Sequence, residues 1–460
     1  MRTAAETVPD RAALITHERV VSWAELASMA LGTVREVQRS PSMTPVVVRA
    51  GLDVESLVLI HGLIATGTPM LLLHPRAKTS ENERIISACQ AIEGPFEGVD
   101  SNRHRVLETL PDDERPLAII PTSGTSGAPK GVVLSRRAFA ASARASATNL
   151  GWREDDRWWL TLPLAHVGGL SVVTRCLQAR RPIVLESAPR FDPLWAIDVI
   201  ERQRVTLLSL VPTMLERLLD HDWRPPSHLR AVLVGGAASS PALLARARQQ
   251  GVPVLTTYGL SEACSQVATE SPDDQTPRPL RGCGRPLPGI DVRIAIDGVI
   301  EIGGPTLFSG YAPSGGESWT ADGWLRTRDL GTFDANGILR VLGRSDSTII
   351  TGGENVVPGE VETVLEAHPS VRSAVVVGVA EPTWGQLVTA TVVLASSTTD
   401  TDQPDLVLWC RDRLASFKCP RFVAIRESLP LGPTGKVDRR AVAEWMRSRV
   451  AGDPNTDARR

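Results

Sequence analysis

The chain has 460 residues, of which 42% are hydrophobic and 22% charged, and its formal net charge is −2. This composition is that of an ordinary globular protein, and the length exceeds what one hydrophobic core usually holds, so we expect two or more domains. The nearly balanced charge disfavours a nucleic-acid-binding protein.

A membrane span and a secreted location are also disfavoured. The most apolar stretch, residues 57–73, contains Gly62, Gly67 and Pro69, so we interpret it as a helix, a turn and a strand. The N-terminus lacks the apolar core of a signal peptide. The six cysteines show no CxxC pair and no zinc-ligand spacing. We therefore expect a cytoplasmic protein with reduced, buried thiols.

Short apolar runs alternate with helical patterns between residues 57 and 257. This alternation is typical of an α/β layer whose strands are buried on both faces. Ligands usually bind in the loops that follow such strands. The predicted strands are residues 117–120, 206–211, 231–234 and 252–257.

The pattern changes after Pro286, where Asp297-Gly298 and Asn336-Gly337 each separate two apolar runs. Both dipeptides are typical of β-hairpin turns. We therefore predict a small antiparallel, barrel-like β subdomain at about residues 287–342, formed by residues 291–296, 299–302, 332–334 and 338–342.

The last hundred residues have the pattern of a compact α+β unit, which is large enough to fold by itself. Its predicted elements are a strand near 348–350, a helix at 359–367, strands at 373–379 and 388–394, and a helix at 406–414. The sequence thus predicts an N-terminal domain over residues 1–343, a hinge over 344–347, a C-terminal domain over 348–450 and a frayed tail over 451–460.

Lysine occurs at only four positions, and one of them, Lys130, lies in a glycine-rich loop that directly follows a predicted strand. Glycines let backbone N–H groups turn toward an anion, hydroxyls add donors and the ammonium adds charge. The loop is not a Walker loop, because Gly131 follows the lysine. A flexible surface turn is the alternative. The candidate phosphate ligands are Thr122, Ser123, Gly124, Thr125, Ser126, Gly127 and Lys130.

This loop resembles the phosphate-binding signature of the adenylate-forming superfamily, which holds acyl-CoA synthetases, peptide-synthetase adenylation domains and luciferases. The resemblance implies a large N-terminal domain of layered α/β subdomains with a barrel-like β subdomain, followed by a small mobile α+β domain. Four further signatures follow in the family's order: residues 256–262 for adenine and magnesium, 327–331 for ribose, 343–346 for the hinge and 433–436 for the catalytic lysine.

The resemblance assigns a role to each charged residue of these segments. Glu262 would bind magnesium, and Asp329 would accept both ribose hydroxyls. Lys436 would stabilise the charge that builds up as a carboxylate attacks the α-phosphate. The alternatives are a helix cap for Glu262, a turn for Asp329 and a surface position for Lys436. Ser261 would contact phosphate, and Arg344 would add a ribose or phosphate contact or form only a hinge salt bridge. The residues that would line the nucleotide site are Thr257, Tyr258, Gly259, Gly235, Gly236 and Ala237.

In this family the C-terminal domain swings about the hinge after adenylation, so that a thiol can enter. Asp346 matches the pivot, and Gly352 and Gly353 would line the tunnel for the thiol of coenzyme A. The implied small molecules are ATP, Mg²⁺, a carboxylic acid and coenzyme A. A homodimer is an option that the sequence leaves open.

Residues 163–170 resemble the segment that borders the acyl pocket of acyl-CoA synthetases. His166 in this segment is either a substrate contact or a packing residue. No aspartate occurs there to pair with an ammonium group, so an amino acid substrate is disfavoured. Ser209 and Thr213 are candidates for other pocket walls.

Residues 258–266, 352–355 and 384–386 look most like the o-succinylbenzoate-CoA ligases of menaquinone synthesis. Ser265 and Gln266 would then bind the distal oxygens of the acid, or would merely cap a helix. The alternatives are a ligase for another aromatic acid or a fatty acid, an enzyme that loads a carrier protein, and a nucleotide-binding protein without turnover. A cationic or hydrogen-bonding pocket floor would favour a dicarboxylate, and an apolar floor a fatty acid.

Overall fold

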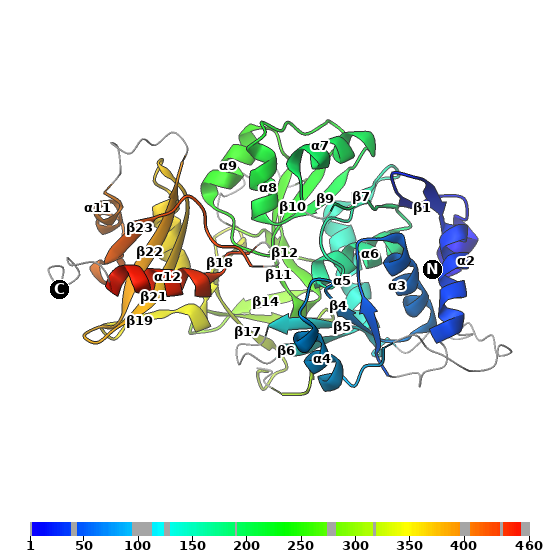
Figure 1. Ribbon diagram of the computed structural model, residues 1–460, viewed down its shortest axis with the longest axis horizontal. Helices are drawn as coiled ribbons and strands as arrows, with labels where there is room; N and C mark the ends of the chain where they lie inside the picture. The colour runs from blue at the N-terminus through cyan, green and yellow to red at the C-terminus, as the bar shows by residue number, and fades with distance from the viewer. Residues whose placement is uncertain are drawn as a thin grey trace.

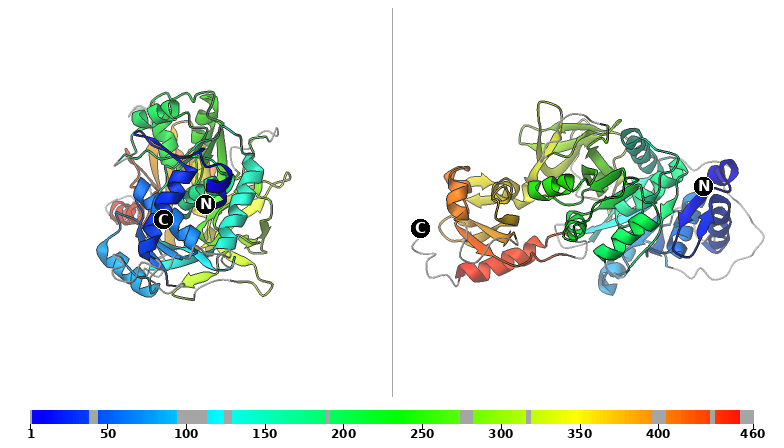
Figure 2. Two further views of the ribbon diagram at one scale, coloured as in Figure 1. Left: turned by 90° about the vertical axis from the view of Figure 1, so that its right-hand side faces the viewer. Right: turned by 90° about the horizontal axis from the view of Figure 1, so that it is seen from above.

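The computed structural model describes residues 2–37, 44–93, 113–123, 129–188, 191–273, 282–315, 319–395, 405–432 and 436–451. The elements of the first 344 residues form the larger part of the molecule, and those from β19 onward form a smaller part at its end (Figure 1). The right-hand view of Figure 2 shows the same division from above. Within the ranges given above, every helix is too short or too polar to cross a bilayer.

A nine-stranded sheet runs through the larger part in the order β13-β12-β11-β10-β9-β7-β8-β1-β2. From β11 to β1 neighbouring strands are parallel, whereas the pairs at both edges are antiparallel. The carboxyl ends of β9, β10 and β11 therefore meet at one edge of the sheet, where ligands of α/β proteins usually bind. The strands are β1 (Ala12–Ile15), β2 (Val20–Ser22), β7 (Trp158–Trp159), β8 (Ile183–Val184), β9 (Leu207–Leu210), β10 (Ala231–Val234), β11 (Val254–Leu260), β12 (Ser265–Thr269) and β13 (Arg285–Pro286).

Helices α5 (Arg136–Leu150), α6 (Val167–Ala179), α7 (Pro193–Arg202), α8 (Pro212–Leu219) and α9 (Pro241–Gln249) belong to this part. Apolar side chains of the last three helices share one core cluster with β9 and β10. Each of these three helices has proline in its first turn. Proline lacks a backbone N–H, and in the first turn that group would have no acceptor within the helix. Asp192 and Ser240 cap α7 and α9.

A second sheet, ordered β16-β6-β5-β4-β3, carries the glycine-rich loop between β5 and β6. The prediction for residues 57–73 is confirmed, because α3 ends at Thr66, Gly67 adopts φ 69° and β4 follows. The elements are α1 (Arg2–Thr7), α2 (Trp23–Val37), β3 (Val46–Arg49), α3 (Val54–Thr66), β4 (Met70–Leu73), α4 (Thr79–Ala88), β5 (Pro116–Ser123), β6 (Pro129–Ser135) and β16 (Gly310–Ala312).

The third sheet, ordered β14-β15-β17-β18, contains both hairpins that the sequence predicted. Its strands are β14 (Asp291–Ile294), β15 (Val299–Gly303), β17 (Leu325–Phe333) and β18 (Leu339–Arg344). β18 ends at Arg344, where the predicted hinge begins, and this sheet lies next to the smaller part (Figure 1).

The smaller part is a five-stranded sheet in the order β20-β19-β22-β21, with β23 paired to β22. Val375, Val377 and Val379 of β21 pack against α12, whereas Ala374 and Val376 belong to the core cluster that includes α10. This period of two buries both faces of the strand. The elements are β19 (Ile349–Thr351), β20 (Glu354–Val356), α10 (Pro358–Glu366), β21 (Val371–Glu381), β22 (Gly385–Leu394), α11 (Leu406–Arg411), β23 (Phe422–Ile425) and α12 (Arg439–Ala451).

Several details of this part differ from the sequence prediction, which did not include β20, β23 or α12. Helix α11 ends at Arg411 rather than at 414. α12 extends through residue 451, where we expected a frayed tail to begin, and residues 452–460 lie outside the described residues.

Candidate active site

Glycine at position 235, directly after β10, allows the chain to pass close to β11. A Cβ atom on Gly235 would lie 2.6 Å from Cγ2 of Thr257, and Gly236 adopts φ +78°. Side chains other than hydrogen are therefore disfavoured at both positions. Gly236 and Ala237 are exposed, so this edge leaves backbone open to a ligand. The hydroxyl of Thr257 faces the other way and contacts Thr269 Oγ1 at 2.8 Å.

A carboxylate and a phenol meet beside this edge. The hydroxyl of Tyr258 donates to Oδ2 of Asp329 at 2.7 Å, and Arg344 Nη1 lies 3.6 Å from Asp329 Oδ1. Burial raises the pKa of Asp329, although Tyr258 and Arg344 oppose that rise. Burial and the neighbouring carboxylate also raise the pKa of Tyr258. Asp329 therefore offers carboxylate oxygens that can accept hydrogen bonds from a diol.

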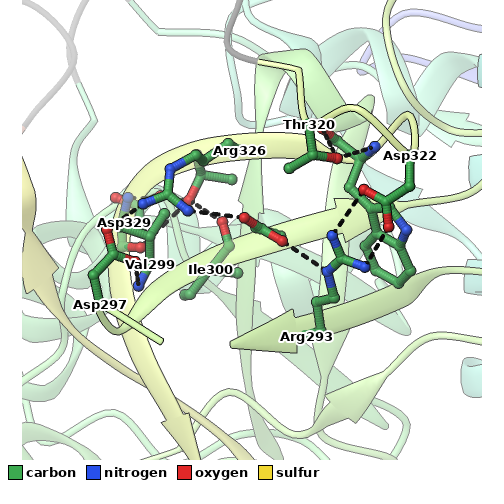
Figure 3. A network of polar contacts seen from close by, with 11 residues as sticks. Arg293, Asp297, Val299, Ile300, Thr320, Asp322, Arg326 and Asp329 are labelled. Atoms are coloured by element: carbon green, nitrogen blue, oxygen red, sulfur yellow. Dashed lines mark hydrogen bonds and ion pairs between the residues drawn. The ribbon is translucent and has the colours of Figure 1, made fainter. Parts of the chain in front are cut away.

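An ion-pair network fixes the strand that carries Asp329 (Figure 3). Glu301 is buried on β15 and receives hydrogen bonds from Arg293 at 2.7 Å and from Arg326 at 2.8 Å. Thr327 Oγ1 donates to the carbonyl of Ile300 at 2.7 Å and accepts from the backbone N–H of Asp329 at 3.1 Å. The backbone of Asp329 is thereby tied to the neighbouring strand.

Glu262 lies in the 3₁₀ turn that Ser261 opens after β11. The hydroxyl of Tyr311 donates to Glu262 Oε1 at 2.8 Å, and Lys130 Nζ lies 5.0 Å from the centroid of the same phenol ring. A single carboxylate fits magnesium, which proteins commonly bind through one or two carboxylates together with substrate phosphates and water. Tyr311 links the candidate metal ligand to the glycine-rich loop, although it was not among the residues predicted from the sequence.

The glycine-rich loop joins β5 to β6, two antiparallel strands in which Thr122 pairs with Lys130 and Ser123 with Pro129. Thr122 Oγ1 donates to the carbonyl of Lys130 at 3.3 Å, and Lys130 Nζ donates to the carbonyl of Gly315 at 3.0 Å. The predicted ligands Gly124, Thr125, Ser126 and Gly127 lie outside the described residues.

Lys436 comes from the smaller part of the molecule but lies at the strand ends of the larger part. A Cβ atom on Gly236 would be 3.9 Å from Cε of Lys436. Burial and the nearby Arg344 lower the pKa of Lys436, while Asp329 opposes that shift. These four residues, from three distant segments, therefore lie together around one candidate site.

His166 adjoins the same site at the start of α6 and makes no capping hydrogen bond there. Burial, together with His74 and Lys436, lowers the pKa of His166 to about 4, so the imidazole is neutral at pH 7. Its ring centroid is 5.9 Å from that of His74. Its Nε2 is buried without a hydrogen-bond partner among the described residues. His74 was not among the residues that we predicted.

Arg175, two turns further along α6, is a buried cation that sequence reasoning missed. Only 3% of its surface is exposed, and burial lowers its pKa to about 10. Its Nη2 donates to Ser265 Oγ at 3.3 Å, and the guanidinium carbon lies 5.6 Å from the ring centroid of Trp158. Within the described part of the chain no carboxylate pairs with it, and its Nε has no partner. The available signal was that Arg175 is the only charged residue in the helix of residues 167–179.

The other residues predicted to line the acid pocket lie on β9, α8 and β12. Ser209 Oγ accepts a hydrogen bond from Trp158 Nε1 at 3.1 Å, and Thr213 lies in the first turn of α8. Gln266 is buried, and its Nε2 donates to Thr269 Oγ1 at 3.1 Å. Ser265 and Gln266 belong to β12, so the alternative that they cap a helix is wrong. Gly259 must be small, because a Cβ there would lie 1.7 Å from the carbonyl oxygen of Ser265.

Two residues of the predicted hinge, Arg344 and Asp346, form an ion pair. Arg344 donates to both carboxylate oxygens of Asp346, at 2.9 and 2.7 Å, so it contacts the hinge as well as Asp329. Gly352 and Gly353 form the exposed turn of the β19–β20 hairpin, with φ +57° and +83°. Both glycines have a structural reason there, because most other residues disfavour positive φ.

Two family models match the chain: AMP-binding enzyme over residues 72–312, and AMP-binding enzyme C-terminal domain over residues 360–436. A 2-succinylbenzoate–CoA ligase of Bacillus licheniformis is 32% identical over 474 residues, which cover 95% of this chain and 98% of the relative. A 2-succinylbenzoate–CoA ligase of Bacillus cytotoxicus is 33% identical, with 95% and 96% covered.

Solved structures agree with these matches. The o-succinylbenzoate CoA synthetase (MenE) of Bacillus subtilis, in complex with the acyl-adenylate intermediate OSB-AMP, has a TM-score of 0.82 at 30% identity, with 96% of this chain and 97% of that one covered. ATP-bound MatB of Rhodopseudomonas palustris has a TM-score of 0.84 at 26% identity, with 97% and 98% covered. The chain therefore belongs to the AMP-binding enzyme family, as an AMP-forming acyl-CoA ligase. The predicted family, fold class and enzyme class are confirmed.

Proposed function

We propose that this enzyme is a 2-succinylbenzoate–CoA ligase that acts in menaquinone biosynthesis in the cytoplasm. In the first step the succinyl carboxylate attacks the α-phosphate of magnesium ATP, which gives an acyl-adenylate and pyrophosphate. In the second step the thiol of coenzyme A attacks the acyl carbon, which gives a thioester and AMP. Relatives support the nucleotide and the metal, since one MenE structure of Bacillus subtilis is a complex with ATP and magnesium ion.

The observation that carries the choice of acid is the buried Arg175. Holding a guanidinium in the interior without a carboxylate partner is unfavourable, so a substrate anion is a reasonable counterion. 2-Succinylbenzoate has a second carboxylate besides the one that is activated, and Ser265 would supply a hydrogen bond beside it. A fatty acid or a simple benzoate has no such group, so Arg175 disfavours both alternatives.

Each predicted site residue receives a role in this proposal. Lys436 would stabilise the charge at the α-phosphate, and its position among Gly236, Asp329 and Arg344 supports that role. Asp329, held by Tyr258, would bind the ribose hydroxyls. A magnesium ion at Glu262 would shield the triphosphate charge. Neutral His166 would border the entering carboxylate.

We further propose residues 1–343 as the N-terminal domain, 344–347 as the hinge and 348–450 as the mobile domain. After adenylation the mobile domain would turn about Asp346. Gly352 and Gly353 would then line the path of the pantetheine thiol.

The test is pyrophosphate release with magnesium ATP against 2-succinylbenzoate, benzoates and fatty acids, with thioester product measured when coenzyme A is added. We expect efficient turnover with 2-succinylbenzoate and at least tenfold lower kcat/KM for acids without a second carboxylate. A monocarboxylic acid that is used as well as 2-succinylbenzoate would contradict the proposed substrate. Acid-dependent pyrophosphate release without any acyl-CoA would point to a carrier-protein thiol.

A further inference from the structure

Arg372 connects the two parts of the molecule. It lies on β21 of the smaller part and donates from Nε to Glu216 Oε1 at 2.6 Å and from Nη2 to Asp220 Oδ2 at 2.7 Å. Glu216 lies on α8 and Asp220 is the C-cap residue of that helix, in the larger part. We call Arg372, Glu216 and Asp220 the clasp. From this geometry we propose that Arg372 is a positioning residue, which holds the mobile domain where Lys436 can reach the α-phosphate.

The carboxylate side of the clasp is itself held in place. Arg246 of α9 donates to Asp220 Oδ1 at 2.8 Å, so the two oxygens of Asp220 are shared between two arginines. Side-chain exposure is 35% for Arg372 and 29% for Glu216, so both groups are partly shielded from water. Partly shielded, doubly hydrogen-bonded ion pairs are stronger than exposed single ones. Arg372 also approaches the C-terminal end of α8, where the helix dipole favours a cation.

A second contact between the two parts depends on glycine. A Cβ atom on Gly359, in the first turn of α10, would lie only 2.3 Å from the carbonyl oxygen of Leu342 on β18. Leu342 precedes the hinge residue Asp346 and Gly359 follows it, so rotation about the hinge would separate them. The observed orientation therefore requires a residue without a side chain at position 359.

Both contacts act on the fraction of molecules that hold Lys436 at the site. Lys436, Arg372 and Gly359 belong to the same part of the molecule, so they move together when that part rotates. A change that weakens the observed orientation lowers its population, and adenylation slows in proportion once that orientation becomes the minor one. Thioester formation uses the other orientation and would not slow. This inference rests on the proposed two-step function.

The experiment compares the half-reactions in the Arg372→Glu variant of the full chain. Adenylation is measured as single-turnover pyrophosphate release without coenzyme A, using the acid that the substrate panel identifies. Thioester formation is measured from the synthetic acyl-adenylate and coenzyme A. We expect adenylation to fall at least tenfold, which corresponds to about 1.4 kcal/mol, and thioester formation to stay unchanged or to rise.

Two further variants separate positioning from general damage. Adding Glu216→Arg to Arg372→Glu reverses the pair and should restore most of the lost adenylation rate. Arg49→Glu is the control. Arg49 lies on β3 of the second sheet and makes an ion pair with Glu93 of the same 2.6 Å length. This variant should leave both half-reactions unchanged.

Gly359→Ala tests the glycine contact independently. Alanine favours a helix more than glycine does, so the melting temperature should not fall, yet adenylation should slow at least tenfold. Two results would overturn the positioning inference but not the proposed function. One is a wild-type adenylation rate in Arg372→Glu, and the other is an equal loss of both half-reactions that the reversed pair does not restore. If the wild-type enzyme formed no adenylate with any acid, the proposed function would fall and this inference with it.

Discussion

Replacing Arg175 by methionine is expected to raise the stability of the protein and to lower its kcat/KM for 2-succinylbenzoate. The pKa of the buried guanidinium is lowered from 12.5 to about 10. Because one pKa unit corresponds to about 1.4 kcal/mol, holding the charged form inside costs about 3 kcal/mol at neutral pH. The hydrogen bond to Ser265 and the contact with Trp158 return about 1 kcal/mol each. Methionine should therefore raise the free energy of unfolding by about 1 kcal/mol.

Activity should change in the opposite direction. Removing one partner of a buried charge pair costs about 2 to 4 kcal/mol, so kcat/KM for 2-succinylbenzoate should fall by roughly 30- to 1000-fold. Activity toward benzoate, which lacks the second carboxylate, should not fall. Chemical denaturation of the apo protein and steady-state kinetics with both acids measure the two effects.

Arg248→Met is the matched control. Arg248 is also a largely buried arginine, but it pairs with Glu270 at 3.0 Å. Its loss leaves a buried carboxylate unpaired, so this variant should lose about 2 to 4 kcal/mol of stability. If Arg175→Met were destabilised as much as this control while retaining full activity, Arg175 would be a structural residue and our reasoning would be refuted.

Three further predictions concern the nucleotide site and pH. Lys436→Ala should slow adenylation by roughly 100- to 1000-fold, yet leave thioester formation from supplied acyl-adenylate within about threefold, as rapid-quench assays would show. Tyr258→Phe removes the 2.7 Å hydrogen bond to the partly buried Asp329 and should raise the KM for ATP by about tenfold, with a smaller change for the acid; an unchanged KM would contradict the assigned contact. Burial lowers the pKa of His61 from 6.5 to about 4, so between these pH values the unfolded chain binds more protons than the folded chain, and the free energy of unfolding decreases as the pH is lowered. From pH 7.5 to 5 His61 alone should cost about 2 kcal/mol, and His61→Phe, followed by urea unfolding at both pH values, should reduce the pH dependence by that amount.

Much of the architecture was predictable because its signals are local. β10 begins and ends at the predicted residues, Ala231 and Val234, and both hairpins form around the predicted Asp297-Gly298 and Asn336-Gly337 turns. Turn dipeptides and buried apolar runs act over a few residues, so they can be recognised along the chain. Helix α12 was missed, because arginines interrupt its apolar pattern and only β21 shows which side is buried.

The family, the two-step chemistry that it implies and the candidate residues Glu262, Asp329 and Lys436 could all be predicted from the sequence. Each of these three residues lies in a short motif whose residue types suit that chemistry. Three contacts became visible only in the folded chain: Lys436 approaches Gly236, Tyr311 contacts Glu262, and Arg175 is buried without a carboxylate partner among the described residues. The physical reason is that burial and charge pairing depend on which distant segments meet. Arg175 on α6 has the same local sequence whether or not β12 and Trp158 enclose it. The free-energy cost of its buried charge, and its proposed role in binding a substrate anion, therefore depend on the folded chain.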